Sequence, residues 1–221
     1  MSRSRLAACA IRNSMFKVRT GMEQTTSPRR RGASLSAGDW IAAAMDALVE
    51  GGVGAVAVEP LAARLGTTKG SFYHHFASRD ALIAAALEEW ERRDTTDVRE
   101  RLQLIGDPRA RIHAVMTAAI TDREGGLRDA ALLASASHPL VAPVVARATA
   151  TRVRYLTDTY VELGLPRDRA RRRALLTSAA YVGLFDLVRS GDVAVTGPEL
   201  RAYADEMLAA LVPAPGGDGP S

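Results

Sequence analysis

The sequence predicts an all-α protein, and three observations carry that prediction. Ala, Leu and Arg are abundant whereas aromatic residues make up only 5% of the chain, and this composition favours helices. Apolar residues recur at helical spacing from about residue 36 to residue 211. No segment of useful length alternates apolar and polar residues as a half-buried strand does.

Two helices open the patterned region. The first runs from about Ser36 to Glu50, with apolar pairs that repeat every four residues, and Gly51–Gly52 ends it. The second, shorter helix runs from about Glu59 to Leu65, tolerates Pro60 in its first turn and ends at Gly66. The apolar pairs of the first helix are Trp40/Ile41, Ala44/Met45 and Leu48/Val49.

The stretch from Thr67 to Phe76 predicts a third, short helix with two different sides. Phe72 and Phe76 are four residues apart and share a face that can pack inward, while Thr67 or Thr68 offers a capping hydroxyl. The other side carries Lys69, Ser71, Tyr73, His74 and His75. Two short helices joined by a turn containing Gly form a helix-turn-helix, whose second helix enters the major groove of DNA.

The segment from Leu61 to Leu82, which reads L-A-A-R-L-G-T-T-K-G-S-F-Y-H-H-F-A-S-R-D-A-L, resembles the DNA-binding motif of the TetR family of transcriptional repressors. The similarity extends from Ser36 to about Leu87. Two departures are visible: Ala57 and Val58 replace the capping Thr with which the family usually starts its second helix, and Arg79 stands where Lys is commoner.

The resemblance implies a division of the chain into four parts. A basic arm (1–34), expected to be disordered, precedes the helix-turn-helix domain (35–82), and a helical effector-binding and dimerisation domain (83–212) precedes a tail rich in Pro and Gly (213–221) that is also expected to be disordered. Residues 1–21 are rich in Arg and Ser, as organellar transit peptides are, but Met22 opens a more ordinary N-terminus for the family. We therefore expect translation to begin at Met22.

The resemblance also assigns DNA contacts to individual positions. Residues at the base edges are Thr68, Lys69, Gly70 and His74, and residues at phosphates are Ser71, Tyr73, His75 and Arg79. The chemistry agrees, since Lys69 can donate to guanine and Arg79 offers a bidentate fork. The alternatives are that Tyr73 and His75 belong to the domain core and that Lys69 and His74 are merely solvated.

The body is predicted to contain six helices. One runs from Arg79 to about Leu104, and the next opens at Asp107–Pro108 and is broken by Gly125–Gly126. A short helix covers Leu127 to Ala134. The remaining helices begin at His138–Pro139, at Pro166 and at Pro198, and they end at Gly164, at Arg189 and at Leu211.

In the family that the chain resembles, the last two main helices pair with those of a second subunit in a four-helix bundle. Here these would be the helices at about 167–189 and 198–211. Small residues that permit close helix approach are Ala174, Ala179, Ala180 and Gly183. The resemblance thus implies a homodimer that binds a two-fold symmetric, double-stranded DNA operator. The alternative is that these residues pack within one chain.

An effector pocket is expected in the body, as the resemblance implies. Its candidate residues are Trp90, His113, Met116, Tyr155, Tyr181 and Phe185. Ordinary core packing is the competing interpretation of each, since amphipathic helices show such stripes anyway. The apolar majority favours a lipophilic or aromatic effector over a cationic or metal-bound one. A regulator controlled by a protein partner or by its own abundance remains the alternative.

Charge is concentrated at the N-terminus. Residues 1–34 contain eight Arg or Lys against Glu23 alone, which gives +7 there and leaves −3 on the remaining 187 residues of a chain with net charge +4. A basic arm that includes Arg29, Arg30 and Arg31 can follow phosphates or the minor groove. A solvated tail is the alternative interpretation.

Other classes of protein lack support in the sequence. Cys9 is the only cysteine, and the four histidines have no usual zinc spacing, so we expect no metal site and no cofactor. Lys69-Gly70-Ser71 reverses the order of a phosphate-binding loop, and no catalytic motif is present, so an enzyme is a remote alternative. No apolar run approaches the roughly 18 residues that span a bilayer. A cytoplasmic location is expected.

Overall fold

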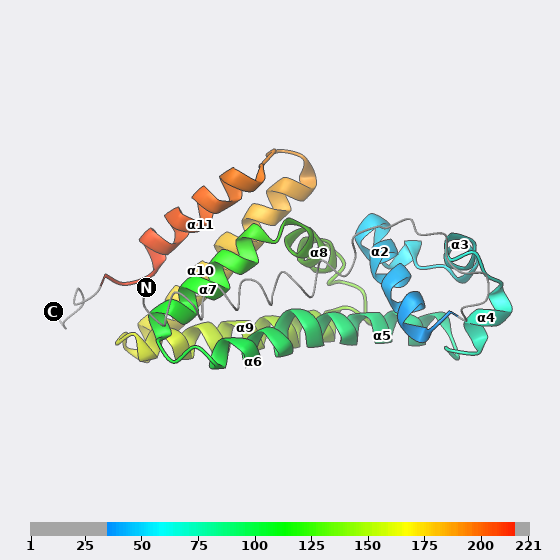
Figure 1. Cartoon of the computed structure of the whole chain (residues 1–221), viewed down its shortest axis with the longest axis horizontal. Coiled ribbons are helices and arrows are strands. Elements are labelled where there is room, and N and C mark those ends of the chain that lie inside the picture. The colour runs from blue at the N-terminus through cyan, green and yellow to red at the C-terminus, as the bar shows by residue number, and fades with distance from the viewer. Residues whose placement is uncertain (1–34, 215–221) are drawn as a thin grey trace. The chain divides into compact units, whose positions relative to one another are not determined.

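The computed structural model describes residues 35–214, which are helical throughout and contain no strand (Figure 1). The elements are α2 (Ala37–Ala55), α3 (Val58–Arg64), α4 (Lys69–Tyr73), α5 (Arg79–Glu91), the π-helical turn η2 (Arg92–Thr96), α6 (Asp97–Gln103), α7 (Pro108–Thr121), α8 (Arg123–Ala134), α9 (Ala142–Glu162), α10 (Arg167–Ser190) and α11 (Gly197–Leu211). The all-α prediction is confirmed.

The helices form two compact units. The N-terminal unit contains residues 35–94 and 131–147, and the C-terminal unit contains residues 95–130 and 148–214. In the N-terminal unit, α2 packs along α5, and α3 packs against α4 (Figure 1). In the C-terminal unit, α7 packs along α11. None of the helices within the described range combines the length and apolar character that a membrane crossing requires.

Helix α2 starts where the sequence predicts, and it has a kink at Gly51 and Gly52, where the sequence predicts its end. The Ser36 hydroxyl accepts a hydrogen bond from the Asp39 amide, and the Asp39 carboxylate accepts one from the Ser36 amide, which completes a capping box. Gly51 and Gly52 have non-helical backbone angles, and Gly52 has φ of +67°, a left-handed conformation that favours glycine. One further turn extends to Ala55 beyond this break.

Two predicted boundaries were wrong because tertiary contacts override local propensity. Gly125 and Gly126 do not break a helix: α7 ends at Thr121 and both glycines lie inside α8. The Asp122 carboxylate accepts from the Gly125 amide (2.9 Å), and the Phe185 ring packs directly over Gly126, where a Cβ would lie 2.3 Å from the ring. A glycine is therefore needed inside this helix.

The segment at His138 and Pro139 is also not the start of a helix. The amides of Val141 and Ala142 both donate to the His138 carbonyl (3.0 and 2.9 Å), so this segment forms turns and α9 begins only at Ala142. The helix predicted from Arg79 is continuous, but it contains the π turn η2, for which the apolar pattern gives no signal.

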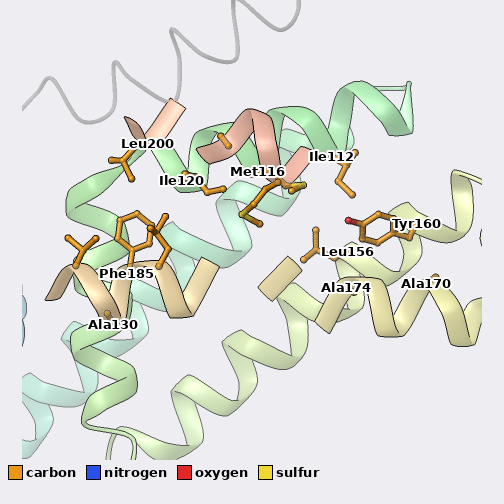
Figure 2. Packing of buried hydrophobic residues seen from close by; sticks show 14 of the residues in the cluster. Ile112, Met116, Ile120, Ala130, Leu156, Tyr160, Ala170, Ala174, Phe185 and Leu200 are labelled. Carbon is orange, nitrogen blue, oxygen red and sulfur yellow. The ribbon is translucent and has the colours of Figure 1, made fainter. Parts of the chain in front are cut away.

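The C-terminal unit has a continuous apolar core, drawn in Figure 2. Helix α7 contributes Ile112, Met116 and Ile120, which point toward Leu156 and Tyr160 of α9 and toward Phe185 of α10. Ala170 and Ala174 are fully buried, so the small residues near the start of α10 serve packing within the chain. Because one face of α9 and one face of α10 pack into this core, the other faces of both helices lie outside it.

Candidate nucleic-acid interface

Helix α4 is short and is held at its N-terminus by a side-chain cap. Gly66 turns the chain with φ of +66°, and the Thr67 amide donates to the Ala62 carbonyl (2.9 Å). The Thr68 hydroxyl then accepts a long hydrogen bond from the Ser71 amide (3.4 Å), as the sequence predicts for one of the two threonines. The preceding helix, α3, starts at Ala57 without a side-chain cap, which matches the departure noted in the sequence.

Two phenylalanines anchor α4 to the rest of the N-terminal unit. Phe72 is completely buried, Phe76 is 9% exposed, and the Phe72 ring meets Trp40 edge-on with centroids 5.3 Å apart. This confirms the inward face that the sequence predicts. Because α4 is too short to be stable by itself, these aromatic contacts hold it in place.

The opposite flank of α4 faces solvent. Tyr73 is 56% exposed although its ring lies 5.0 Å from Phe72, so it is not a core residue. Exposed or half-buried residues on this flank are Thr68, Lys69, Gly70, Ser71, His74 and His75. The structure thus brings the predicted contact residues of α4 together on one accessible surface.

Lys69 has a partner that the sequence did not reveal. Its ammonium donates to Glu59 of α3 at 3.0 Å, and both side chains are more than half exposed. This hydrogen bond raises the pKa of Lys69 above its usual value, so the ammonium is fully charged at neutral pH. On binding DNA, the Lys69 ammonium would exchange the Glu59 carboxylate for another anion or acceptor. Because the ion pair with Glu59 is exposed to water, its loss costs little free energy.

Arg79 is engaged within the chain. Its Nε donates to the Val56 carbonyl (2.5 Å), and one Nη donates to the Val53 carbonyl, while the other Nη lies 3.5 Å from Asp80. The guanidinium therefore ties the start of α5 to the end of α2 and to the residue before α3. Sequence reasoning missed this role, because the partners are backbone atoms more than 20 residues away.

The predicted pocket residues lie in different parts of the described chain. Met116 and Phe185 are buried in the core of the C-terminal unit, His113 is exposed, and Trp90 is buried in the N-terminal unit. Tyr155 lines a pocket of about 270 Å³ between α6, α7 and α9, and it alone of the six candidates does so.

Tyr181 belongs to a buried polar cluster that the sequence did not indicate. Its hydroxyl donates to the Asp129 carboxylate (3.0 Å), which also accepts from Arg152 (2.6 Å). The Arg152 Nε in turn donates to the Thr95 hydroxyl (3.1 Å) at the π turn. These four residues come from η2, α8, α9 and α10, so no local sequence pattern could have found them.

The basic arm lies outside the described residues. The expectations for Arg29, Arg30 and Arg31, for Met22 as the start of translation, and for the tail at 215–221 therefore stay predictions.

A short, capped helix with a solvent-facing polar flank, preceded by α3 and a Gly turn, defines a helix-turn-helix protein of the DNA-binding regulator class. Residues 41–86 match the sequence model of a family described as bacterial regulatory proteins, tetR family. These residues therefore form a DNA-binding domain of the type found in that family. No curated protein matches it.

Solved structures show the same fold over most of the chain. A TetR-family transcriptional regulator from Agrobacterium tumefaciens matches with a TM-score of 0.66 at 18% identity, covering 79% of this chain and 96% of that one. A transcriptional regulator from Rhodococcus sp. Rha1 matches with a TM-score of 0.65 at 23% identity, covering 80% and 96%. The regulator FadR from Bacillus subtilis, solved in complex with stearoyl-CoA, matches with 0.63 at 15% identity, covering 80% and 98%.

Proposed function

We propose that the protein is a repressor that binds a palindromic operator as a homodimer in the cytoplasm and is released by a small lipophilic or aromatic effector. The observation that carries this proposal is the exposed flank of α4, whose polar side chains are not covered by any segment within residues 35–214, while Phe72 and Phe76 hold the helix from its other side. An exposed row of donors on a rigidly held helix is suited to a DNA groove.

The DNA contacts follow from the position of each side chain on α4. Thr68, Lys69, Gly70 and His74 are assigned to base edges, and Ser71, Tyr73 and His75 to phosphates. Arg79 was expected at a phosphate, but its bonds to the Val53 and Val56 carbonyls support a positioning role instead. The operator contacts thus depend on Arg79 indirectly.

The exposed face of α10 supports the homodimer. Leu176 is 57% exposed, and Leu175 and Leu187 on the same helix are also exposed. Within residues 35–214, no atom other than those of the adjacent residues and the helix backbone lies within 4 Å of a Cβ built at Gly183, so packing within the described subunit does not require glycine there. Burial of this face by a second copy would remove the leucines from water and let the helices approach at Gly183.

Substitution of one exposed leucine tests the dimer. Leu176→Glu would place a charge in the proposed interface, and we expect the protein to sediment as a monomer and to lose operator affinity. Arg123→Glu, at an exposed position of α8 outside the two helices expected in the dimer, is a control for added negative charge. A Leu176→Glu protein that remains dimeric would contradict the α10 interface.

The effector would act by selecting between two arrangements of the dimer. The arrangement favoured by the effector no longer matches the half-site spacing, and operator affinity falls by a coupling energy of typically about 1–3 kcal/mol. The complex of FadR with stearoyl-CoA shows that a protein of this fold binds a lipophilic ligand. The similar solved proteins are regulators, which supports a regulator over an enzyme here.

Recovery of genomic fragments on the purified protein, read by sequencing, tests the function. We expect a single palindromic motif whose half-sites are about one helical turn apart, or a multiple of it. Enrichment without any palindrome would overturn operator binding by a dimer. Control by a protein partner or by abundance would be favoured if the operator is recovered and no small molecule raises the melting temperature.

A further inference from the structure

The pocket between α6, α7 and α9 is polar and lies within the C-terminal unit. One face of α9 forms a wall, with Arg154, Asp158 and Glu162 spaced along it, and Arg99 of α6 and Arg111 of α7 complete the ring of charges. Its volume of about 270 Å³ is just below the roughly 300–1,000 Å³ of sites for drug-sized ligands. It is large enough for a small acid or for the polar end of a longer molecule.

The two acidic residues of the pocket already have basic partners. Glu162 accepts hydrogen bonds from both amino groups of Arg111 (2.9 and 3.0 Å), and Asp158 lies 3.5 Å from Arg167. Arg111 is further fixed by donation to the Ile105 carbonyl (3.1 Å). These pairs neutralise one another and leave no carboxylate for the other two arginines of the pocket.

Arg99 and Arg154 are therefore uncompensated. Both side chains are exposed, both line the pocket from different helices, and neither has a carboxylate or hydrogen-bond partner among residues 35–214. Two guanidinium groups that face one cavity repel each other weakly in water, and an oxyanion between them would remove that repulsion. Guanidinium groups bind carboxylate and phosphate oxygens through short, charge-assisted hydrogen bonds.

The same pocket contains a hydroxyl without a partner. The Tyr155 hydroxyl oxygen is buried and makes no hydrogen bond of acceptable geometry within the described residues. The neighbouring Thr159 hydroxyl donates instead to the Tyr155 backbone carbonyl (2.9 Å). Burial raises the pKa of Tyr155 to about 12, so the hydroxyl keeps its proton at neutral pH and can donate it to an anion. A buried donor without an acceptor, on a residue that lines the same pocket as Arg99 and Arg154, indicates a missing acceptor.

We propose that this pocket binds the oxyanion of a small organic acid, a carboxylate or a phosphate, through Arg99 and Arg154, with the Tyr155 hydroxyl as a third donor. The inference rests on the proposed function, because it names the chemistry of the effector. The apolar part of a lipophilic or aromatic acid would contact the apolar core beside α9, and its acidic group would bind Arg99 and Arg154.

Titration calorimetry and thermal melting of the full-length protein test this proposal. The probes are benzoate and octanoate, their uncharged counterparts benzyl alcohol and octanol, and inorganic phosphate, each at millimolar concentration. We expect at least one anion to bind and to raise the melting temperature, while the alcohols do not. If only the carboxylates bind, or only phosphate binds, the result identifies which oxyanion the pocket prefers.

Substitutions of the pocket residues test whether the anion binds in this pocket. Arg99→Gln combined with Arg154→Gln is expected to weaken anion binding at least about tenfold, and Tyr155→Phe to weaken it about threefold to tenfold. Arg93→Gln combined with Arg123→Gln removes two exposed charges that lie outside the pocket and outside α10 and α11, and should leave anion binding unchanged. Operator affinity without ligand should be the same in all these proteins, which shows that they fold.

Two results would overturn the inference. One is that no anion binds although the operator is recovered, in which case the DNA-binding function stands and the anion site is wrong. The other is that the arginine double variant binds the anion as tightly as the unmodified protein. Failure to recover any operator, with anion binding intact, would instead reject the proposed function and leave the pocket as assigned.

Discussion

The two units of the molecule use their polar side chains in opposite ways. In the N-terminal unit, α4 turns its polar flank to solvent, and Tyr73 and His74 are exposed. In the C-terminal unit, Asp129 is buried and accepts hydrogen bonds from Arg152 and Tyr181. Polar groups that await an external partner must stay accessible, whereas buried polar groups must find their partners inside the fold. Substitutions in the two units should therefore separate binding from stability.

The largest effect is expected from the buried cluster. Asp129→Ala would leave Arg152 without its carboxylate and Tyr181 without its acceptor, and we expect the free energy of unfolding to fall by about 3–5 kcal/mol. Urea unfolding followed by circular dichroism measures this loss. Asp186→Ala removes the exposed ion pair with Arg189 and should cost under about 1 kcal/mol. Similar losses for both variants would contradict the structural role of the cluster.

Substitution of Arg79 should affect both operator binding and stability, because its guanidinium holds the helix-turn-helix in place. Arg79→Ala removes the hydrogen bonds to Val53 and Val56, and we expect a loss of stability of about 2 kcal/mol together with weaker operator binding. The salt dependence of binding should not change, since no phosphate contact is lost. A slope reduced by about one unit would show instead that Arg79 contacts a phosphate.

Gly126 in the C-terminal unit and Gly70 in the N-terminal unit allow the same substitution, glycine to alanine, to be compared between the two units. Gly126→Ala would push a methyl group into the Phe185 ring, and we expect a loss of about 1–3 kcal/mol in unfolding free energy with operator contacts intact. At Gly70 a Cβ would meet only the Thr68 hydroxyl oxygen at 3.6 Å, an ordinary contact. Gly70→Ala should leave stability unchanged and weaken operator binding. The reverse pattern in urea unfolding and operator titration would contradict both assignments.

The smallest effect is expected at Lys69. Lys69→Ala should weaken operator binding and, if the ammonium contacts one phosphate, lower the slope of log affinity against log salt by about one unit, with no change in stability. Arg123→Ala removes an exposed charge outside the N-terminal unit and outside α10 and α11, and is the control. Unchanged affinity and slope for Lys69→Ala would exclude this residue as a DNA contact.

How well the sequence predicted each feature depends on how far apart along the chain the interacting residues lie. Phe72 and Phe76 were correctly placed inward, because a spacing of four residues defines a helix face without any tertiary information. The partners of Lys69 and Arg79 were missed, since Glu59 lies on another helix and the acceptors of Arg79 are backbone carbonyls. Of the pocket candidates, only Tyr155 lines the described pocket, and the assignment of the others stays a prediction, because an amphipathic stripe does not distinguish core packing from the lining of a cavity.

By itself, the sequence determined the all-α class, the helix-turn-helix with its exposed flank, and several helix ends, among them those at Gly66 and Gly164, which adopt positive φ. These features depend on spacing, capping and backbone preference, which act over a few residues. Only the tertiary structure decided that Gly126 lies inside a helix, that Tyr181 pairs with Asp129, and that Arg99 and Arg154 share one pocket. Such pairings join residues far apart in the chain, and packing of the whole unit selects them over local preference.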